Sequence, residues 1–207
     1  MKSVLISIRP KWCELIASGQ KTLEVRKTRP KLEVPFKVYI YCTSGTGKNT
    51  FNVPVSHEQF AKHYAETGSM ECLNCPIGNG KVIGEFICDA ITPLFNVCTD
   101  NWHHLAGDVH EWHKELVKRA CLTDVELKSY AKGKNCFAWN ISDLKIYEQP
   151  KELCDFRKPF PFHSFCKICA RGGTGFNSET CYGCDHFENI NITRPPQSWC
   201  YVEEVFP

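Results

Sequence analysis

The sequence predicts an α+β fold, in which a small β-barrel is decorated by helices and carries a C-terminal module of different character. Over residues 1–150, many short segments are rich in β-branched and aromatic residues, which is typical of strands. A few helical segments interrupt them, without the regular strand and helix alternation of a doubly wound sheet. From residue 151 onward Gly, Pro and Cys become frequent, which indicates a separate unit.

The first elements follow directly from the hydrophobic pattern. Residues 3–8 are mostly apolar and predict a strand. Residues 11–18 place apolar side chains on one helical face, and Gly19 stands where a left-handed helix stop is expected. The chain then predicts an extended segment over residues 22–26 and a further strand over residues 36–42.

The middle of the chain predicts three more helices and two long strands. Capping residues mark where these helices begin: Ser56 with Gln59, Asp108, and Thr123 with Glu126. The first of these helices is expected to run to about residue 67, and the third to end near Gly133. A turn at Asn79 and Gly80 leads into a predicted strand over residues 81–91, and another strand is predicted over residues 135–147.

Three charges alternate directly after the first predicted helix. In an extended chain Glu24 and Arg26 share one face, and Lys21 stands at the entrance to the same segment. Two cations and a carboxylate therefore converge on a small volume, which indicates the wall of a polar pocket. A surface ion-pair cluster of little energetic weight is the alternative interpretation.

The residues Gly19, Lys21, Glu24 and Arg26 match the G-x-K-x-x-E-x-R signature of the ASCH domain family, a branch of the PUA-like β-barrels. The resemblance extends to three further segments: residues 7–10, 81–86 and 137–141. It covers roughly residues 1–150, together with the final strand-like segment. It implies a PUA-like small β-barrel over residues 1–150, onto which residues 195–207 pack back as a C-terminal strand.

Charge and hydropathy limit the classes of partner. The formal net charge is only +2, yet residues 1–31 hold eight Lys and Arg side chains against two Glu. A basic patch beside a polar pocket suits a phosphate-bearing partner such as RNA, DNA or a nucleotide. The alternative is a solvated basic face. No apolar stretch approaches the length of a membrane helix, so we expect a cytoplasmic protein without a membrane partner.

Paired cysteines in the C-terminal part predict a structural zinc site. Its four expected ligands form two C-x-x-C pairs: Cys166, Cys169, Cys181 and Cys184. Four thiolates leave no open coordination position, which favours structure over catalysis. His163 or His186 could replace one cysteine, and a redox dithiol pair is the alternative. Another pair, Cys72 and Cys75, lacks identifiable partners.

The cysteine-rich segment is expected to depend on this metal. Residues 151–194 contain few large aliphatic side chains, so burial alone could hardly fold them. We therefore expect a zinc-stapled insertion between the barrel and the last strand. Other cysteines, such as Cys42, Cys88 and Cys136, lie singly in apolar runs and are expected to be reduced, buried thiols.

The resemblance implies a binding module as the main function. PUA-like barrels often recognise RNA or modified bases, and some hold a flipped base through edge hydrogen bonds and aromatic stacking. A charged pocket would here bind RNA or a nucleotide-like ligand. Its expected ligand-binding residues are Arg9, Lys21, Glu24, Arg26 and, as a stacking surface, Trp12. Trp139 is the alternative stacking surface.

The resemblance also implies an enzymatic alternative. Some small ASCH-type proteins are amidohydrolases that act on an acetylated cytidine, using a lysine of the motif, a threonine three residues later and a glutamate on the central strand. Lys21 and Glu85 match two of these positions as catalytic candidates, but Glu24 replaces the threonine and lacks its hydroxyl. A ribonuclease is a further alternative, as is a structural or partner-binding protein in which the charges form an internal network.

Overall fold

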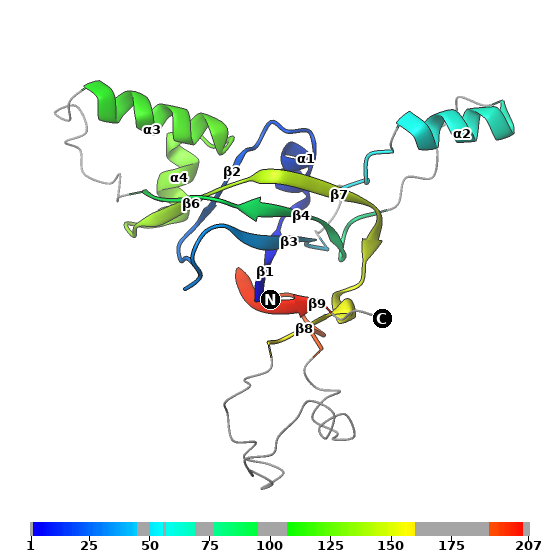
Figure 1. The fold of residues 1–207 in the computed structure, drawn as a ribbon. Helices are drawn as coiled ribbons and strands as arrows, with labels where there is room; N and C mark the ends of the chain where they lie inside the picture. The colour runs from blue at the N-terminus through cyan, green and yellow to red at the C-terminus, as the bar shows by residue number, and fades with distance from the viewer. Residues whose placement is uncertain are drawn as a thin grey trace, which may run out of the picture.

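A computed structural model describes residues 2–44, 50–55, 57–68, 77–94, 107–159 and 191–204. It confirms the predicted α+β class (Figure 1). In chain order, the helices and strands are β1 (Ser3–Ile8), α1 (Pro10–Ala17), β2 (Leu23–Arg26), β3 (Phe36–Cys42), α2 (His57–Thr67), β4 (Val82–Cys88), β5 (Ile91–Leu94), α3 (Gly107–Arg119), α4 (Asp124–Ala131), β6 (Cys136–Asn140), β7 (Ser142–Lys151), a short 3₁₀ turn (Leu153–Asp155), β8 (Phe156–Arg157) and β9 (Trp199–Glu204).

Two sheets form the body of the protein. The larger has the strand order β7-β4-β3-β1-β9-β8, with β1 and β3 parallel and the other neighbours antiparallel. The smaller has the order β2-β6-β5 and is antiparallel throughout. The larger sheet is curled, so the predicted barrel is present as a half-barrel whose sheets are hydrogen-bonded separately (Figure 1).

Each of the two long predicted strands is in fact two strands that belong to different sheets. The segment predicted over residues 81–91 divides into β4 and the start of β5, and the one over residues 135–147 divides into β6 and β7. Both divisions occur where the chain crosses between the sheets, and the Asn140 amide donates to the Ala90 carbonyl there. Apolar alternation continues through both crossings, so hydrophobic periodicity alone did not indicate where one strand ends and the next begins.

Helix α1 begins with Pro10 at its first position, where the missing amide hydrogen is not needed. It ends at Ala17, and Gly19 adopts the expected left-handed conformation with φ of +74°. The sequence predicts a buried face of Trp12, Leu15 and Ile16. Ile16 is buried as predicted, but Pro10 and Cys13 complete the buried face, while Trp12 and Leu15 are only half-buried. The Trp12 side chain therefore remains partly accessible to solvent.

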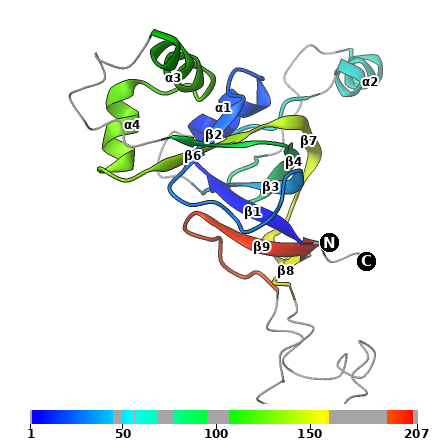
Figure 2. The same cartoon turned by 60° about the vertical axis from the view of Figure 1, so that its left-hand side comes forward.

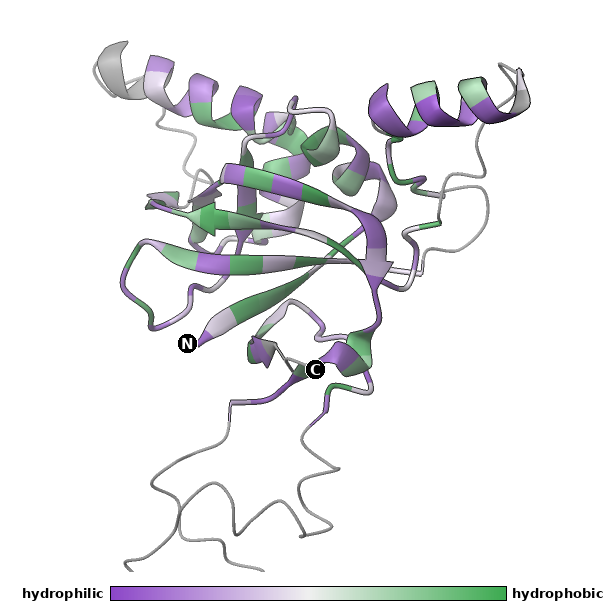
Figure 3. Cartoon of the chain, turned by 45° about the vertical axis from the view of Figure 1, so that its right-hand side comes forward, coloured by the Kyte–Doolittle hydropathy of each residue, from purple (hydrophilic) through white to green (hydrophobic). Residues whose placement is uncertain are grey.

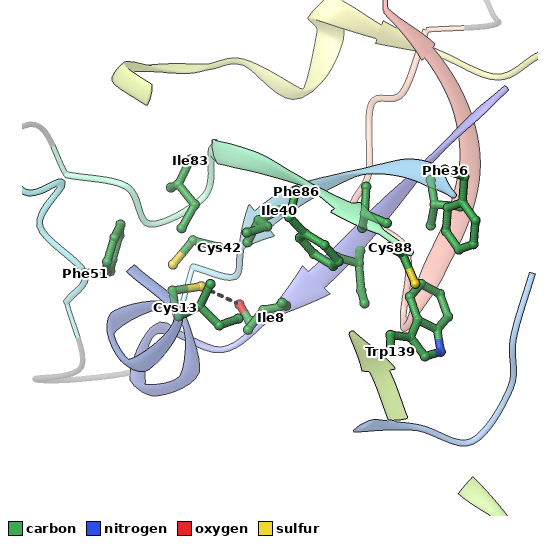
Figure 4. Close-up of a cluster of buried hydrophobic side chains, with 14 of the residues drawn as sticks. Ile8, Cys13, Phe36, Ile40, Cys42, Phe51, Ile83, Phe86, Cys88 and Trp139 are labelled. Carbon is green, nitrogen blue, oxygen red and sulfur yellow. Dashed lines mark hydrogen bonds between the residues drawn. The ribbon is translucent and has the colours of Figure 1, made fainter. Parts of the chain in front are cut away.

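The main core lies between α1 and the larger sheet. Figure 4 shows Cys13 and Cys42 facing one another within it, beside Ile83. The thiols of the described residues are free, and burial raises the pKa of Cys88 to about 12. Figure 3 shows hydrophobic residues gathered in the central strands, whereas the outlying helices α2 and α3 carry hydrophilic bands.

Two further clusters complete the packing. One joins α3 and α4 to the smaller sheet, through residues such as Leu116 and Leu127. The other lies on the opposite face of the larger sheet, where Tyr39 and Tyr147 pack with Phe156 of β8. In the described residues, none of the helices is long and apolar enough to cross a membrane.

The observed helix starts agree in part with those that the capping residues predicted. Thr123 and Glu126 form the predicted capping box of α4. Asp108 lies inside α3, which spans Gly107–Arg119, whereas the sequence predicted it just before the helix. Several other predictions lie outside the described residues: Ser56 as a cap, the pair Cys72 and Cys75, and the proposed zinc ligands Cys166, Cys169, Cys181 and Cys184 with their alternatives His163 and His186.

Candidate functional site

A pocket of about 630 Å³ opens where the end of β1, α1, β2 and α4 meet. Figures 1 and 2 both show α1 and α4 flanking β2. The segment that precedes β9 forms the remaining wall. The residues that line the pocket are Ser7, Ile8, Arg9, Trp12, Lys21, Glu24, Val25, Arg26, Thr43, Leu122, Glu126, Tyr130, Pro195, Pro196, Gln197 and Ser198.

The three predicted charges form one buried network in the wall of this pocket. One carboxylate oxygen of Glu24 lies 3.3 Å from the Lys21 ammonium, and the other lies 2.9 Å from the Arg26 guanidinium. Lys21, Glu24 and Arg26 are only 3%, 7% and 8% exposed. The alternative of a solvated surface cluster is therefore wrong for these side chains.

Backbone carbonyls hold both cations in place. The Lys21 ammonium donates to the Ala120 carbonyl at 2.7 Å, and the Arg26 Nη2 donates to the Ser7 carbonyl at 2.7 Å. The Arg26 Nη1 also lies 3.4 Å from the hydroxyl of Ser198. The network thus joins β2 to the end of α3, to β1 and to the segment before β9.

One donor of this network has no hydrogen-bond partner within the described residues. The Nε atom of Arg26 is buried and makes no hydrogen bond within the described part of the chain. A buried donor without an acceptor costs about 1–3 kcal/mol. Arg26 lines the pocket, while its Nε atom is itself covered by the protein.

The predicted aromatic residues differ in their accessibility. Trp12 lines the pocket, and the ammonium groups of Lys11 and Lys21 lie 4.7 and 5.1 Å from its ring centroid. Trp139 is fully buried and packs between Phe36 and Trp199. The prediction of Trp139 as a stacking surface is therefore wrong, because no ligand can reach its ring.

Glu85 lies away from the pocket. It faces Tyr39 across β3 and β4, and its carboxylate accepts hydrogen bonds from Lys37 at 3.0 Å and Tyr147 at 2.5 Å. Burial opposes ionisation, but the two hydrogen bonds and the charges of Lys37 and Lys145 together lower the pKa of Glu85. Since Tyr39 belongs to the cluster opposite α1, the structure does not bring Glu85 and Lys21 together.

Sequence reasoning missed the part of the wall that α4 contributes. Tyr130 of α4 lines the pocket, and burial raises the pKa of its hydroxyl. Arg26 opposes this shift and Glu24 adds to it, which places the hydroxyl within the field of the charged network. The capping box identified the helix, but no local signal indicated which surface it covers.

The segment before β9 was also missed as a pocket wall. Ser7 donates its hydroxyl to the Pro196 carbonyl at 2.7 Å, and its amide donates to the Ser198 carbonyl at 2.9 Å. These two bonds attach residues 195–198 to the end of β1. Pro195 and Pro196 indicate an irregular stretch. No local pattern predicts that this stretch lies against β1, because the two segments are far apart in the sequence.

The curled half-barrel with inserted helices defines a protein of the PUA-like class. The family model of the ASCH domain matches residues 6–151, and the chain belongs to the ASCH domain family. Members of this family generally bind nucleic acid, RNA in particular. The signature residues Lys21, Glu24 and Arg26 all fall within the matched range.

Among solved structures, the chain is similar to ASCH from Zymomonas mobilis, with 18% identity over 73% of each chain and a TM-score of 0.45. It is also similar to a tyrosine-to-phenylalanine variant of that protein, with 19% identity over 74% of this chain and 77% of the other. A serine-to-alanine variant gives 20% identity over 73% and 74%. Both variants also have TM-scores of 0.45. A search of curated proteins found no significant match.

Proposed function

We propose that this protein binds RNA or a nucleotide-like ligand in the pocket around Lys21, Glu24 and Arg26. The observation that carries the proposal is the buried charge network, whose two cations and carboxylate all line a cavity. Buried ion pairs contribute little net stability to a fold, because desolvation offsets much of their attraction. A volume of about 630 Å³ falls in the usual range of small-molecule sites.

Each member of the network has a different role in this proposal. The Arg26 guanidinium donates to an oxygen of the ligand, which a base carbonyl or a phosphate supplies. Glu24 accepts from an amino or imino group of a base, which RNA recognition commonly uses. Lys21 orients Glu24, and Arg9 and Trp12 contact the ligand at the pocket edge.

A binding screen against nucleosides, modified nucleosides and short RNAs tests this function, with thermal shift first and calorimetry for each hit. Arg26→Lys keeps the charge but removes the forked guanidinium donors, so we expect it to weaken the best hit about tenfold or more, as for a lost hydrogen bond to a charged group. Lys37→Gln is the control, since it removes a half-buried cation of the ion pair on the opposite face.

The same screen separates binding from a purely structural role. Lys21 and Arg26 also tie β2 to neighbouring backbone carbonyls, which favours the structural interpretation as a second candidate. That interpretation predicts a lower melting temperature in Arg26→Lys with unchanged ligand affinity. We do not propose the amidohydrolase, because it needs Lys21 and Glu85 in one site. No observation in the described residues favours a ribonuclease.

We further propose that Cys166, Cys169, Cys181 and Cys184 hold a structural zinc ion. Their two C-x-x-C pairs support this, as does the scarcity of large aliphatic residues around them. Purified protein is expected to contain one zinc per chain, and replacing both Cys166 and Cys169 with serine is expected to abolish it. The free thiols of the core suit a reducing compartment, so we place the protein in the cytoplasm.

A further inference from the structure

Two lysines stand beside the pocket, each over an aromatic ring that lines it. The Lys11 ammonium lies 4.7 Å from the ring centroid of Trp12, which belongs to α1. The Lys27 ammonium lies 5.0 Å from the ring centroid of Tyr130, which belongs to α4. Trp12 and Tyr130 thus belong to different helices of the pocket wall, and one lysine stands over each ring. Figure 2 shows α1 and α4 as separate helices near β2.

These contacts hold the ammonium groups in place without neutralising them. An aromatic face attracts a cation through its quadrupole and leaves the full positive charge available. Within the described residues, neither Lys11 nor Lys27 forms a salt bridge. Both ammonium groups therefore stand next to rings that line the pocket, with their charge available to an outside anion.

The charge around the opening favours an anion. Arg9 lines the pocket with an exposed side chain, which adds a third cation to the two lysines. The nearby carboxylate is that of Glu126, which accepts hydrogen bonds from the amide and hydroxyl of Thr123 in the capping box. Glu126 is thus engaged in the helix cap, and the three cations outnumber it.

We propose that Lys11 and Lys27 contact the phosphates on either side of one nucleotide of single-stranded RNA, while that nucleotide occupies the pocket. This inference rests on the proposed function and specifies its ligand. A free nucleoside has no phosphate to reach either lysine. A duplex would keep its bases stacked and paired, whereas a pocket between two phosphate contacts needs an unstacked nucleotide.

The test compares an RNA oligomer with a free nucleoside that the pocket binds, over a series of salt concentrations. The double variant Lys11→Ala, Lys27→Ala removes both proposed contacts. The matched control is Lys2→Ala, Lys145→Ala, which removes two exposed lysines outside the pocket lining. Melting temperatures of both variants report whether each remains folded.

In the Lys11, Lys27 variant, we expect the slope of log affinity against log salt for the RNA to fall in magnitude by about 0.7 for each lysine removed. Nucleoside affinity is expected to stay unchanged, because neither lysine reaches into the network. The control pair is expected to keep the wild-type slope. Each single lysine variant is expected to lose about half of the effect.

Several outcomes would overturn the inference. Equal slopes in the two double variants would assign the salt dependence to general surface charge. Loss of nucleoside affinity in the Lys11, Lys27 variant would place these lysines inside the binding site. Absence of RNA binding by the wild-type protein would reject the inference outright.

Failure of the proposed function gives a different result. In that case nucleosides do not bind, and Arg26→Lys leaves RNA affinity unchanged. Dependence on Lys11 and Lys27 would then mark a nucleic-acid surface without a nucleotide in the pocket.

Discussion

Glu24 supplies the negative charge of the network that it forms with Lys21 and Arg26. It lies between Lys21 and Arg26, so that removing it leaves two buried cations without their counter-charge. We expect Glu24→Ala to lower the free energy of unfolding by on the order of 3 kcal/mol, as for other broken buried pairs. Urea denaturation of the ligand-free protein measures this loss.

Glu85 provides the comparison for this prediction. Its ion pair with Lys37 is more exposed, with side chains 21% and 39% accessible, against 9% for the Glu24 side chain. We expect Glu85→Ala to lower the free energy of unfolding by only about 1 kcal/mol. Equal losses in the two variants would contradict the view that the pocket network is the more strongly desolvated one.

The three charges could be predicted to converge because their spacing is local. Glu24 and Arg26 are two residues apart in a strand, so any extended conformation places them on one face. The unpartnered Nε of Arg26 could not be predicted in the same way. Ser7 and Ser198, which bind the two terminal guanidinium nitrogens and leave Nε unpartnered, come from elsewhere in the chain.

Among the elements, β4 and β7 approach unusually closely at Gly84. A Cβ atom at this position would lie 2.4 Å from the Lys145 carbonyl oxygen and 3.1 Å from the Cα of Ile146. Backbone atoms cannot move aside as a side chain can. We expect Gly84→Ala to lower the free energy of unfolding by about 2 kcal/mol through overpacking, as measured by urea denaturation.

Gly133 gives a matched control for this substitution. It has φ of +75°, and a Cβ atom added there would meet open space, so Gly133→Ala introduces backbone strain without a clash. A loss near 1 kcal/mol is expected there. If Gly84→Ala lowered the free energy of unfolding no more than Gly133→Ala, this would contradict the view that the close packing of β4 against β7 requires glycine at position 84.

Helices and strands differ in how far the sequence predicts them. The capping box of α4 involves only Thr123 and Glu126, so it could be read from four consecutive residues. The division of β4 from β5 depends on a hydrogen bond between Ala90 and Asn140, which are far apart in the chain. Local patterns therefore predicted the presence of elements but not the sheet to which each belongs.

The whole molecule closes through its first and last strands. Antiparallel pairing joins β1 to β9, with Ile6 opposite Trp199, and this pairing brings residues 195–198 to the pocket. The chain before the cysteine-rich segment and the chain after it also meet. Arg157 pairs with Asn191, and the Ile192 amide donates to the Phe156 carbonyl at 2.8 Å.

This closure predicts that residues 160–190 can be replaced without loss of the pocket. The two ends of that segment are already neighbours, so a short Gly/Ser linker can join them at a small entropic cost. We expect the shortened protein to unfold cooperatively, to bind the same nucleosides within about twofold of wild type, and to contain no zinc. Calorimetry and metal analysis measure these properties.

A control that instead ends the chain at residue 190 loses β9 and Ser198, and should lose both folding and binding. If the linker variant failed to fold, the cysteine-rich segment would itself stabilise the half-barrel, and zinc would then be needed for the pocket.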